Sequence, residues 1–414
     1  MRRPAPARKA AAARRKAPPS RVLRPVEPEQ VGLSSERLAR IGTAFEEQVQ
    51  RGRLPGAVVL VARHGQLAYW QAVGRRDPAK LEPMQRNDLF RIYSMTKPIV
   101  SVGIMMLVEE GRLLLNDPVS KYLPNLGGRQ VAVPDSGPAA GYRLERAQRD
   151  ITVQDLLRHT SGLTYGFRET HLKRVYEQAE EGIQDLTNAQ VVERLAELPV
   201  AFQPGTVWEY SRSTDVLGYL IEVLSGQSLE MFLQERILGP LGMDDTAFHA
   251  PLGEQHRLAQ PGPDTLTGQP QAILNVLQPP RFQSGGGGLV SSAGDYARFA
   301  QMLLNGGELE GVRLLGPRTL RLMAADHLGG IAHGKEFIAG PGHGFGLGFA
   351  VRLEAGQAPV PGSVGEFFWS GAAGTHFWVD PQEALIAVMM IQAPSLRQDF
   401  RQLIRNVVLQ AIVA

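Results

Sequence analysis

Strand-like segments occupy both ends of this 414-residue chain, and helix-like segments occupy its middle. Near the start, GAVVLVARHGQLAYWQAVG (56–74) contains two apolar, β-branched runs joined at His64-Gly65, which predicts an antiparallel hairpin. After residue 343, the runs GFGLGFAVRL, GEFFWSG, GTHFWVD and EALIAVMMI predict further strands. Because the sequence between them has amphipathic helical spacing broken by Pro/Gly loops, the natural assembly is an antiparallel sheet built from both chain ends.

These segments predict an α/β (α+β) fold in which an antiparallel sheet is flanked by helices and a mainly helical domain is inserted. A functional site would lie in the cleft between the two parts. The predicted division of the chain is a disordered basic tail at 1–26, an α/β domain formed by 27–111 and 285–414, and an inserted helical domain at 112–284.

The charges of the chain are unevenly distributed. Residues 1–24 carry nine Lys/Arg and no acid, which leaves 35 basic and 41 acidic residues in the remainder, a net charge of −6. This mildly acidic body argues against a nucleic-acid-binding fold. The start lacks apolar periodicity, and its longest alanine run (10–13) is too short for a signal peptide, so we expect a flexible tail on a soluble, cytoplasmic protein. No later apolar run reaches membrane-spanning length, and the absence of cysteine excludes disulfides and thiolate metal sites.

The segment RIYSMTKPIV (91–100) places Ser94 and Lys97 three residues apart, directly before Pro98. Proline is tolerated only in the first turn of a helix, so a helix must begin close to Ser94. The serine oxygen would then lie at the positive end of the helix dipole, and the lysine would lie on the same face, able to act as a base if burial lowers its pKa. Ser-x-x-Lys alone is a common pattern, and a plain helix N-cap at Ser94 is the alternative.

Further segments favour the catalytic interpretation. WEYSRSTDVLGYLIE supplies Tyr210-Ser211 before a predicted helix, and EFFWSGAAGTHFWVD supplies Trp369-Ser370-Gly371 between two strand-like runs. With LLRHTSGL, ILGPLGMDDTAF and GGGGLVSSAGDYARF in the same order, they resemble the serine β-lactamase-like superfamily, in the branch of class C β-lactamases and family VIII carboxylesterases. In that family a Ser-x-x-Lys opens a helix, a Tyr-x-Asn-like motif faces it, and a Lys-Thr-Gly-like triad lies on the sheet's edge strand.

The resemblance implies a role for each matching residue. Ser94 would be the acylated nucleophile, Lys97 its proton acceptor or relay, and Tyr210 would share the base role, with the choice between the two left open. The backbone N–H groups of Ser94 and Ala372 would form the oxyanion hole. No cofactor is expected, and no metal, because neither His-x-x-x-His spacing nor clustered carboxylates are present.

Two departures from the family pattern concern the substrate. The triad is Trp369-Ser370-Gly371 rather than Lys-Thr-Gly, so an apolar wall replaces the cation that pairs with a β-lactam carboxylate, and Trp369 and Gly371 are the expected substrate contacts. Arg212 stands where lactamases place asparagine. If this arginine faced inward, its charge would disfavour a protonated Lys97, although the position varies among the esterases and the side chain is free to point outward.

Four other residues have both a catalytic and a structural interpretation. The chain lacks Gly-x-Ser-x-Gly, so His159 in HTSGL is expected to stabilise a loop rather than to belong to a Ser-His-Asp triad. His376 is expected to be a packed or surface strand residue. Tyr165 and Phe167 are placed either in the wall of an acyl pocket or in ordinary packing.

The leading hypothesis is a serine carboxylesterase that cleaves short-chain esters through an acyl group on Ser94. Two alternatives share the scaffold, namely a penicillin-recognising β-lactamase or DD-peptidase and an acyltransferase. A non-catalytic binding module is disfavoured because the serine, lysine and tyrosine are all present. The expected partner is a small-molecule ester, with no nucleic acid and no membrane span, while the oligomeric state and the natural ester stay open.

Overall fold

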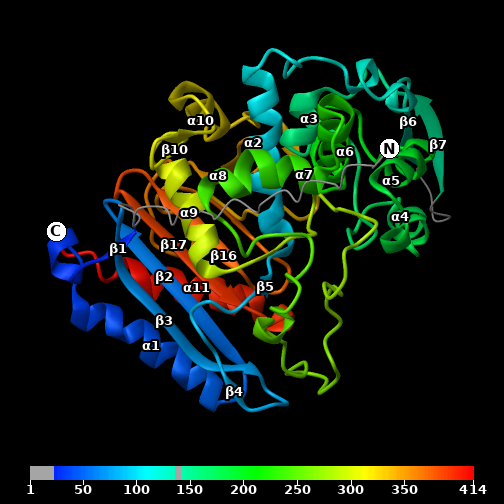
Figure 1. Ribbon diagram of the computed structural model, residues 1–414. Helices are drawn as coiled ribbons and strands as arrows, with labels where there is room; N and C mark the ends of the chain where they lie inside the picture. The colour runs from blue at the N-terminus through cyan, green and yellow to red at the C-terminus, as the bar shows by residue number, and fades with distance from the viewer. Residues whose placement is uncertain (1–22, 136–140) are drawn as a thin grey trace, which may run out of the picture.

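The computed structural model describes residues 23–135 and 141–414 (Figure 1). Most of the expected basic tail, residues 1–22, lies outside the described residues. Within the last four tail positions the prediction is wrong, because Arg24–Pro25 forms β1 and pairs in parallel with β3 (Gln66–Asp77). The amide of Leu23 bonds the carbonyl of Gly65 at 2.9 Å, so the sheet begins before residue 27.

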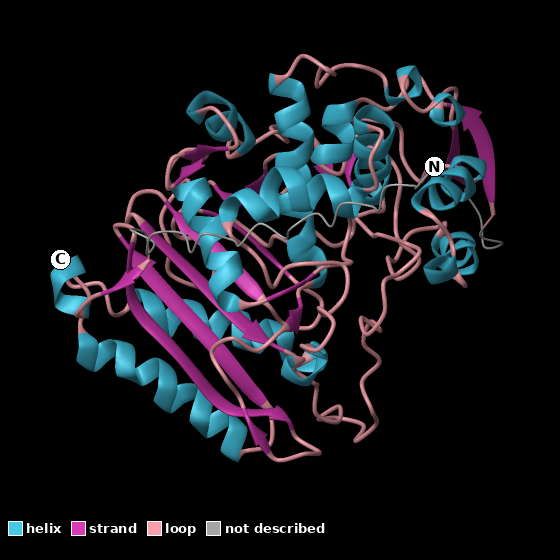
Figure 2. Ribbon diagram, viewed as in Figure 1, coloured by secondary structure: helices cyan, strands magenta, loops and turns pink. Residues whose placement is uncertain are grey.

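One large sheet organises the molecule, and its strands come from both ends of the chain, as predicted (Figures 1 and 2). All pairings along it are antiparallel except β1 with β3. A short strand, β4 (Glu82–Pro83), pairs with β3 outside the main order. The main order is β1, β3, β2 (Gly56–Arg63), β17 (Leu385–Ile391), β16 (His376–Asp380), β15 (Phe367–Ser370), β14 (Ala350–Arg352) and β13 (His343–Phe345).

The centre of the sheet joins the two ends of the sequence. β2 and β3 form the predicted hairpin, and both turn residues, His64 and Gly65, have positive φ, as the tightest hairpin turns require. β17 pairs with the other side of β2 over seven residues, from Leu385↔Arg63 to Ile391↔Ala57. Both strands are buried on both faces, which explains their continuous apolar sequence.

Two amphipathic helices cover one face of the sheet, α1 (Ser35–Gln50) and α11 (Arg397–Leu409) (Figure 1). Ser34 caps α1, because its hydroxyl accepts from the amide of Arg37 at 3.3 Å. The rings of Phe45 and Phe400 stack with centroids 6.0 Å apart and join the two helices over the sheet.

The other face of the sheet is covered by α2 (Thr96–Glu109) and α9 (Ala293–Leu304), and beyond them lie the helices of the middle segment. α2 is buried on nearly all sides because it also packs against α6 and α7, with Gly103 close to the side chains of both. The remaining helices are α3 (Val153–Leu157), α4 (Lys173–Glu180), α5 (Asn188–Glu197), α6 (Ser213–Ser225), α7 (Leu229–Leu233), α8 (Gly239–Leu241) and α10 (Pro317–Met323).

Residues 112–284 share one continuous hydrophobic core with the sheet, so their division into a separate inserted domain stays a prediction. Four two-stranded sheets complete the described structure: β5 (Phe90–Arg91) with β9 (Val290–Ser291), β6 (Gln130–Pro134) with β7 (Tyr142–Arg146), β8 (Val207–Trp208) with β12 (Ala332–His333), and β10 (Glu308–Leu309) with β11 (Val312–Arg313). Among the residues described, no single helix has the length and hydropathy to cross a membrane, and only a bent pair, Ser213–Ser225 with Leu229–Leu241, meets both criteria in combination.

Candidate active site

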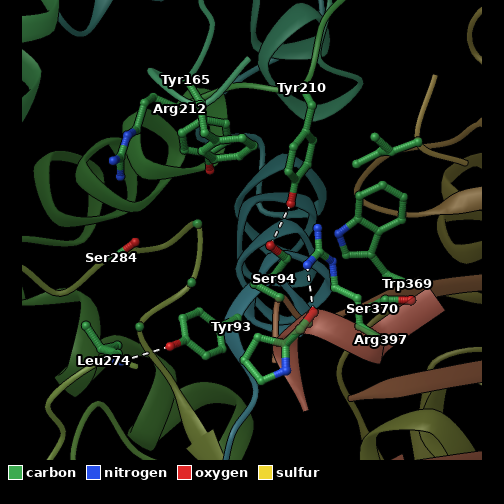
Figure 3. A pocket seen from close by; sticks show the side chains of 18 of the residues that line it. Tyr93, Ser94, Tyr165, Tyr210, Arg212, Leu274, Ser284, Trp369, Ser370 and Arg397 are labelled. Atoms are coloured by element: carbon green, nitrogen blue, oxygen red, sulfur yellow. Dashed lines mark hydrogen bonds between the residues drawn. The ribbon is translucent and has the colours of Figure 1, made fainter. Parts of the chain in front are cut away.

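Ser94 lies in a single 3-10 turn, Tyr93–Met95, that leads directly into α2. Pro98 is the third residue of that helix, as the sequence predicted. The alternative role of Ser94 as an N-cap is wrong, because Met95 occupies the cap position of α2 and no side chain caps it. Instead, the hydroxyl of Ser94 accepts a hydrogen bond of 2.7 Å from the phenol of Tyr210 (Figure 3).

Lys97 is buried, with 1% of its surface exposed. Its ammonium donates to the carbonyl of Gly286 at 2.6 Å and to the hydroxyl of Tyr165 at 3.0 Å. It also lies 4.6 Å from the centre of the Tyr210 ring. None of the hydrogen bonds between described residues joins Lys97 to Ser94. Tyr210 lies between them: its hydroxyl contacts Ser94, and its ring contacts the ammonium of Lys97.

The environment of Lys97 keeps it charged. Burial alone would lower the pKa of Lys97, but attraction to the two tyrosine hydroxyls and to the carboxylate of Asp215 outweighs burial and raises the pKa above its ordinary value. From the sequence, Lys97 could act as a base only if burial lowered this pKa. The pKa is raised instead, because the partners of Lys97 come from segments that are distant in the chain.

The four-glycine run 285–288 brings these groups together. A Cβ on Gly286 would lie 2.9 Å from a carboxylate oxygen of Asp215 and 3.0 Å from the hydroxyl of Tyr165, both too close. Asp215 in turn holds the run in place, because it accepts from the Gly286 amide at 2.9 Å and from the Ser284 hydroxyl at 2.6 Å. The glycines therefore allow a backbone carbonyl to reach the buried ammonium.

The Trp369-Ser370-Gly371 triad lies at the end of β15, facing the turn that carries Ser94. The sequence placed it on an edge strand, which is wrong because β15 pairs with β16 on one side and β14 on the other. However, β14 reaches only Phe367 and Phe368, so Trp369 and Ser370 lie beyond it on an open stretch of strand.

Gly371 follows the strand where space is most restricted. A Cβ there would lie 2.4 Å from the carbonyl of Ile92 and 2.2 Å from the hydroxyl of Thr375, so only glycine fits. The next residue, Ala372, lines the same cavity as Ser94, and its amide donates to no other described residue. This amide is available to an oxyanion, as the expected role requires.

Arg212 neither points outward nor contacts Lys97. Its guanidinium lies 4.8 Å from the centre of the Tyr165 ring and pairs with Glu180 at 2.9 Å and with Asp215 at 3.3 Å. These two carboxylates raise the pKa of the arginine despite its burial, so it stays charged on the far side of Tyr165.

The two histidines considered from the sequence lie away from the serine hydroxyl. His159 is buried, and its ring packs 4.9 Å from that of Tyr210 while its Nδ1 pairs with the hydroxyl of Ser211 at 3.1 Å. His376 pairs with the hydroxyl of Ser370 at 2.8 Å. Burial lowers the pKa of both histidines well below the ordinary value, so both are neutral at pH 7.

These residues surround a cavity of about 750 Å³, which we call the Ser94 cavity. Its size suits a small organic ligand. Aromatic and aliphatic side chains form much of its wall, including Tyr165 and Phe167, which stack on each other at 4.8 Å. Other large apolar and aromatic residues of the wall are Tyr93, Tyr210, Phe248, Leu274, Phe282, Ile338, Phe368 and Trp369.

Sequence reasoning missed several contributors to this site. The sequence motifs assigned no role in the site to Asp215 or to the carbonyl of Gly286. Arg397 and Arg401 of α11 line the cavity from a helix 26 residues or more beyond Gly371 in sequence, which no local pattern indicates. Their placement depends on how α11 packs on the sheet.

An antiparallel sheet between two helical layers, with Ser, Lys and Tyr meeting at the start of a central helix, defines the serine β-lactamase-like superfamily. The comparisons with known proteins agree. The Beta-lactamase family model matches residues 41–412, and the chain belongs to this family of hydrolases.

Several known proteins are similar to this chain over most of its length. Protein Rv1367c of Mycobacterium tuberculosis is 39% identical over 370 residues, covering 86% of this chain and 90% of the relative. Esterase EstB of Burkholderia gladioli is 32% identical over 393 residues, covering 88% and 93%. Among solved structures, EstCE1, a hydrolase with promiscuous acyltransferase activity, has a TM-score of 0.77 at 28% identity and covers 90% of this chain and 98% of its own.

Proposed function

We propose that this protein is a serine carboxylesterase that transfers the acyl group of an ester first to Ser94 and then to water. The observation that carries the proposal is the hydrogen bond of 2.7 Å between Tyr210 and Ser94, with the buried ammonium of Lys97 beside the tyrosine ring. A tyrosine held beside a cation can take up the serine proton once it has lost its own, and can then return that proton.

The resting pair, a phenol and an ammonium, must first lose one proton. Because the raised pKa of Lys97 favours the ammonium, the phenolate of Tyr210 is the form that accepts the proton of Ser94. The Ser94 oxygen then attacks the ester carbonyl, and the C–O bond to the alcohol breaks. The proton passes from Tyr210 to the departing alkoxide, which leaves as the neutral alcohol and regenerates the phenolate.

Deacylation repeats these steps with water. Tyr210 takes a proton from water, the resulting hydroxide attacks the acyl carbon, and the proton returns to the Ser94 oxygen as the acid is released. In both steps the negative carbonyl oxygen would be bound by the amides of Ser94 and Ala372. Two such donors, fixed in place by the backbone, stabilise the transition state strongly.

The chemistry of the wall favours esters over β-lactams. Trp369 is buried and packs against Tyr210 with ring centres 5.5 Å apart, so the triad offers a flat apolar surface where the lactamases have a lysine. EstB, named an esterase, supports the same substrate class at 32% identity.

Acyl transfer to an alcohol is the second candidate. Two observations favour it: EstCE1 is described as a hydrolase with promiscuous acyltransferase activity, and the Ser94 cavity of about 750 Å³ has room for an acceptor beside an acyl group. Transfer and hydrolysis share the same acylated serine and differ only in whether an alcohol or water attacks it.

Trapping the acyl group tests the proposal. The protein is mixed with a p-nitrophenyl ester, quenched in acid, and its intact mass and Ser94 peptide are compared with those of the Ser94→Ala variant. We expect one acyl group, located on Ser94 and absent from the variant. Acylation of another residue would contradict the proposal. A parallel incubation with penicillin separates the β-lactamase alternative, which predicts a long-lived penicilloyl adduct on Ser94.

The ratio of hydrolysis to transfer is measured in the same material. Adding butanol to the ester reaction yields free acid if water is the acceptor and a butyl ester if the alcohol is. A binding module without activity would give neither product and no adduct.

A further inference from the structure

All five residues of β7 (Tyr142–Arg146) are exposed at the surface. The strand pairs with β6 on one side, and no strand that the structure describes lies along its other side. Figure 1 shows the β6–β7 pair at the outer edge of the molecule, beyond the helices of the middle segment. No residue of β7 lines the Ser94 cavity. β7 therefore has a free edge that faces solvent, outside the candidate active site.

The hydrogen bonds between β7 and β6 leave alternate backbone groups of β7 unused. Just beyond the strand, the amide of Ala147 donates to the carbonyl of Arg129 at 2.8 Å, and the register between the two strands has no bulge. In an antiparallel pair, residues that exchange hydrogen bonds alternate with residues whose N–H and C=O groups point the other way. The N–H and C=O groups of Tyr142, Leu144 and Arg146 therefore point to the free edge, where another strand can pair with them.

The side chains of β7 divide between the two faces of the strand. Arg143 and Glu145 lie on one face and form an ion pair at 2.9 Å. Tyr142, Leu144 and Arg146 lie on the other face, and 55% of the surface of Leu144 is exposed. The strand is self-complementary about Leu144, because a basic residue precedes the leucine and an acidic residue follows it.

We propose that β7 is a dimerisation edge, which pairs antiparallel with β7 of a second copy of this chain across a twofold axis at Leu144. Such pairing joins the two β6–β7 pairs into one continuous sheet and satisfies the outward N–H and C=O groups of both strands. The inference goes beyond the proposed function and does not depend on it, because β7 lies outside the Ser94 cavity.

Charge selects this register and favours a second copy over an unrelated strand. With the axis at Leu144, Arg143 lies opposite Glu145 of the second copy, and the same pair recurs on the other side of the axis. An axis at Arg143 would place two arginines opposite each other, and an axis at Glu145 would place two glutamates there, so both registers are disfavoured. On the other face the two Leu144 side chains meet, and the Tyr142 ring lies opposite the guanidinium of Arg146 of the second copy, a favourable cation–π pair.

The contact is small, which sets the expected strength of the dimer. A strand of five residues on each copy buries much less than the roughly 1,200 Å² of a stable interface, so we expect a reversible dimer with a dissociation constant on the order of 100 µM. Sedimentation velocity of the full chain, from about 5 to 500 µM, covers both sides of this value. The sedimentation coefficient should rise with concentration from that of the monomer toward that of the dimer.

Charge variants separate pairing at β7 from association through another face. Arg143→Glu and Glu145→Arg each replace the attractive cross-strand pairs by repulsive ones, so each alone should raise the dissociation constant about tenfold or more. An equimolar mixture of the two variants restores opposite charges across the axis and should dimerise at least as tightly as the unmodified chain. Glu308→Arg is the matched control and should leave the dissociation constant unchanged, because Glu308 belongs to an exposed ion pair with Arg313 on the separate sheet of β10 and β11.

Single cysteines locate the axis, since the chain has no cysteine of its own. The two Leu144 Cα atoms would lie about 5.5 Å apart, within reach of a disulfide, so Leu144→Cys should form a linked dimer on oxidation. Arg146→Cys should not link to itself, because the axis keeps its two copies apart. It should link to Tyr142→Cys when these two variants are mixed.

A chain that stays monomeric at the highest concentration would overturn the dimerisation edge. A dimer that Arg143→Glu leaves unchanged would overturn it as well, since that dimer would form through another face. The same holds if Arg146→Cys links to itself as fast as Leu144→Cys does. Should a charge variant fail to fold, which circular dichroism reveals, the unmodified chain and the cysteine variants still decide between these outcomes.

Discussion

The ammonium of Lys97 donates a hydrogen bond to the hydroxyl of Tyr165 over 3.0 Å, and no described hydrogen bond links it to the hydroxyl of Ser94. The lysine therefore acts on the serine through Tyr210, whose ring it contacts at 4.6 Å. This arrangement supports a proposal for the two roles that the sequence left open. In the proposed mechanism the tyrosine moves the proton, and the lysine supplies a positive charge beside its ring.

Tyrosine replacements test this division of roles. Tyr210→Phe should lower the rate of Ser94 acylation by about 10²–10⁴-fold, because the group that accepts the serine proton is lost. Tyr165→Phe should lower it by about tenfold, the effect of removing one hydrogen bond from a charged donor. Rapid-mixing measurements of p-nitrophenol release give both rates, and equal losses in the two variants would contradict the assignment.

The rate should rise with pH as the Lys97–Tyr210 pair loses its first proton. Asp215 is a negative charge that raises the pKa of Lys97 and so favours protonation of the pair. Asp215→Asn should therefore move the rising limb of kcat/KM to lower pH, by about half a unit to one unit. Arg212→Gln removes a nearby positive charge and should move the limb to higher pH. Shifts in the same direction would show that the variants act through structure rather than charge.

Gly371 should tolerate no side chain. In Gly371→Ala the added carbon would press against the carbonyl of Ile92 and the hydroxyl of Thr375, which should displace the Ala372 amide from the oxyanion position. We expect kcat to fall by about 10²–10³-fold and the free energy of unfolding by about 1–3 kcal/mol. Gly356→Ala is the control, because a Cβ there has no neighbour within 4 Å. An unchanged kcat in Gly371→Ala would contradict the proposed role of the Ala372 amide as an oxyanion donor.

Asp155 should stabilise the loop that carries His159 in a pH-dependent way. Burial alone would raise the pKa of this carboxyl, but hydrogen bonds from Arg149, Thr152 and Thr160 outweigh burial and hold the pKa below 3.8. A lowered folded-state pKa means that the stabilisation is present above about pH 4 and is lost as the pH falls through the folded value.

We therefore expect Asp155→Asn to lower the free energy of unfolding by about 3 kcal/mol at pH 7, at the low end for a buried ion pair because Arg149 is partly exposed. Urea unfolding of both proteins from pH 7 to pH 3 measures the effect. The difference should be constant down to about pH 5 and shrink below pH 4. If the difference in the free energy of unfolding does not change with pH, the lost stability comes from packing and not from the charge of Asp155.

The strongly patterned parts of the fold were predictable from sequence. The helix at 35–50 and the hairpin of β2 and β3 have clear periodicity, a serine cap and a two-residue turn, so local physics specifies them. β1 was missed because Arg24–Pro25 forms a strand only through its pairing with β3. The position of β15 inside the sheet was missed because the short strands β13 and β14 carry little signal of their own.

The candidate active site was likewise predictable from the sequence only in part. Ser94, Lys97 and Tyr210 were found from motifs, and the structure brings them together. The contacts of Lys97 with Gly286 and Tyr165 were not found, because they depend on three chain segments that approach one another only in the folded state. Long-range packing also placed the arginines of α11 in the cavity, where no sequence spacing relates them to Ser94.

The most direct test of the account is the initial rate on p-nitrophenyl butyrate, measured for the unmodified protein beside Ser94→Ala. The account predicts steady release of p-nitrophenol by the former and its loss in the latter to the background rate, because a single hydroxyl carries the acyl group. Undiminished turnover in Ser94→Ala would contradict the central claim that Ser94 is the nucleophile.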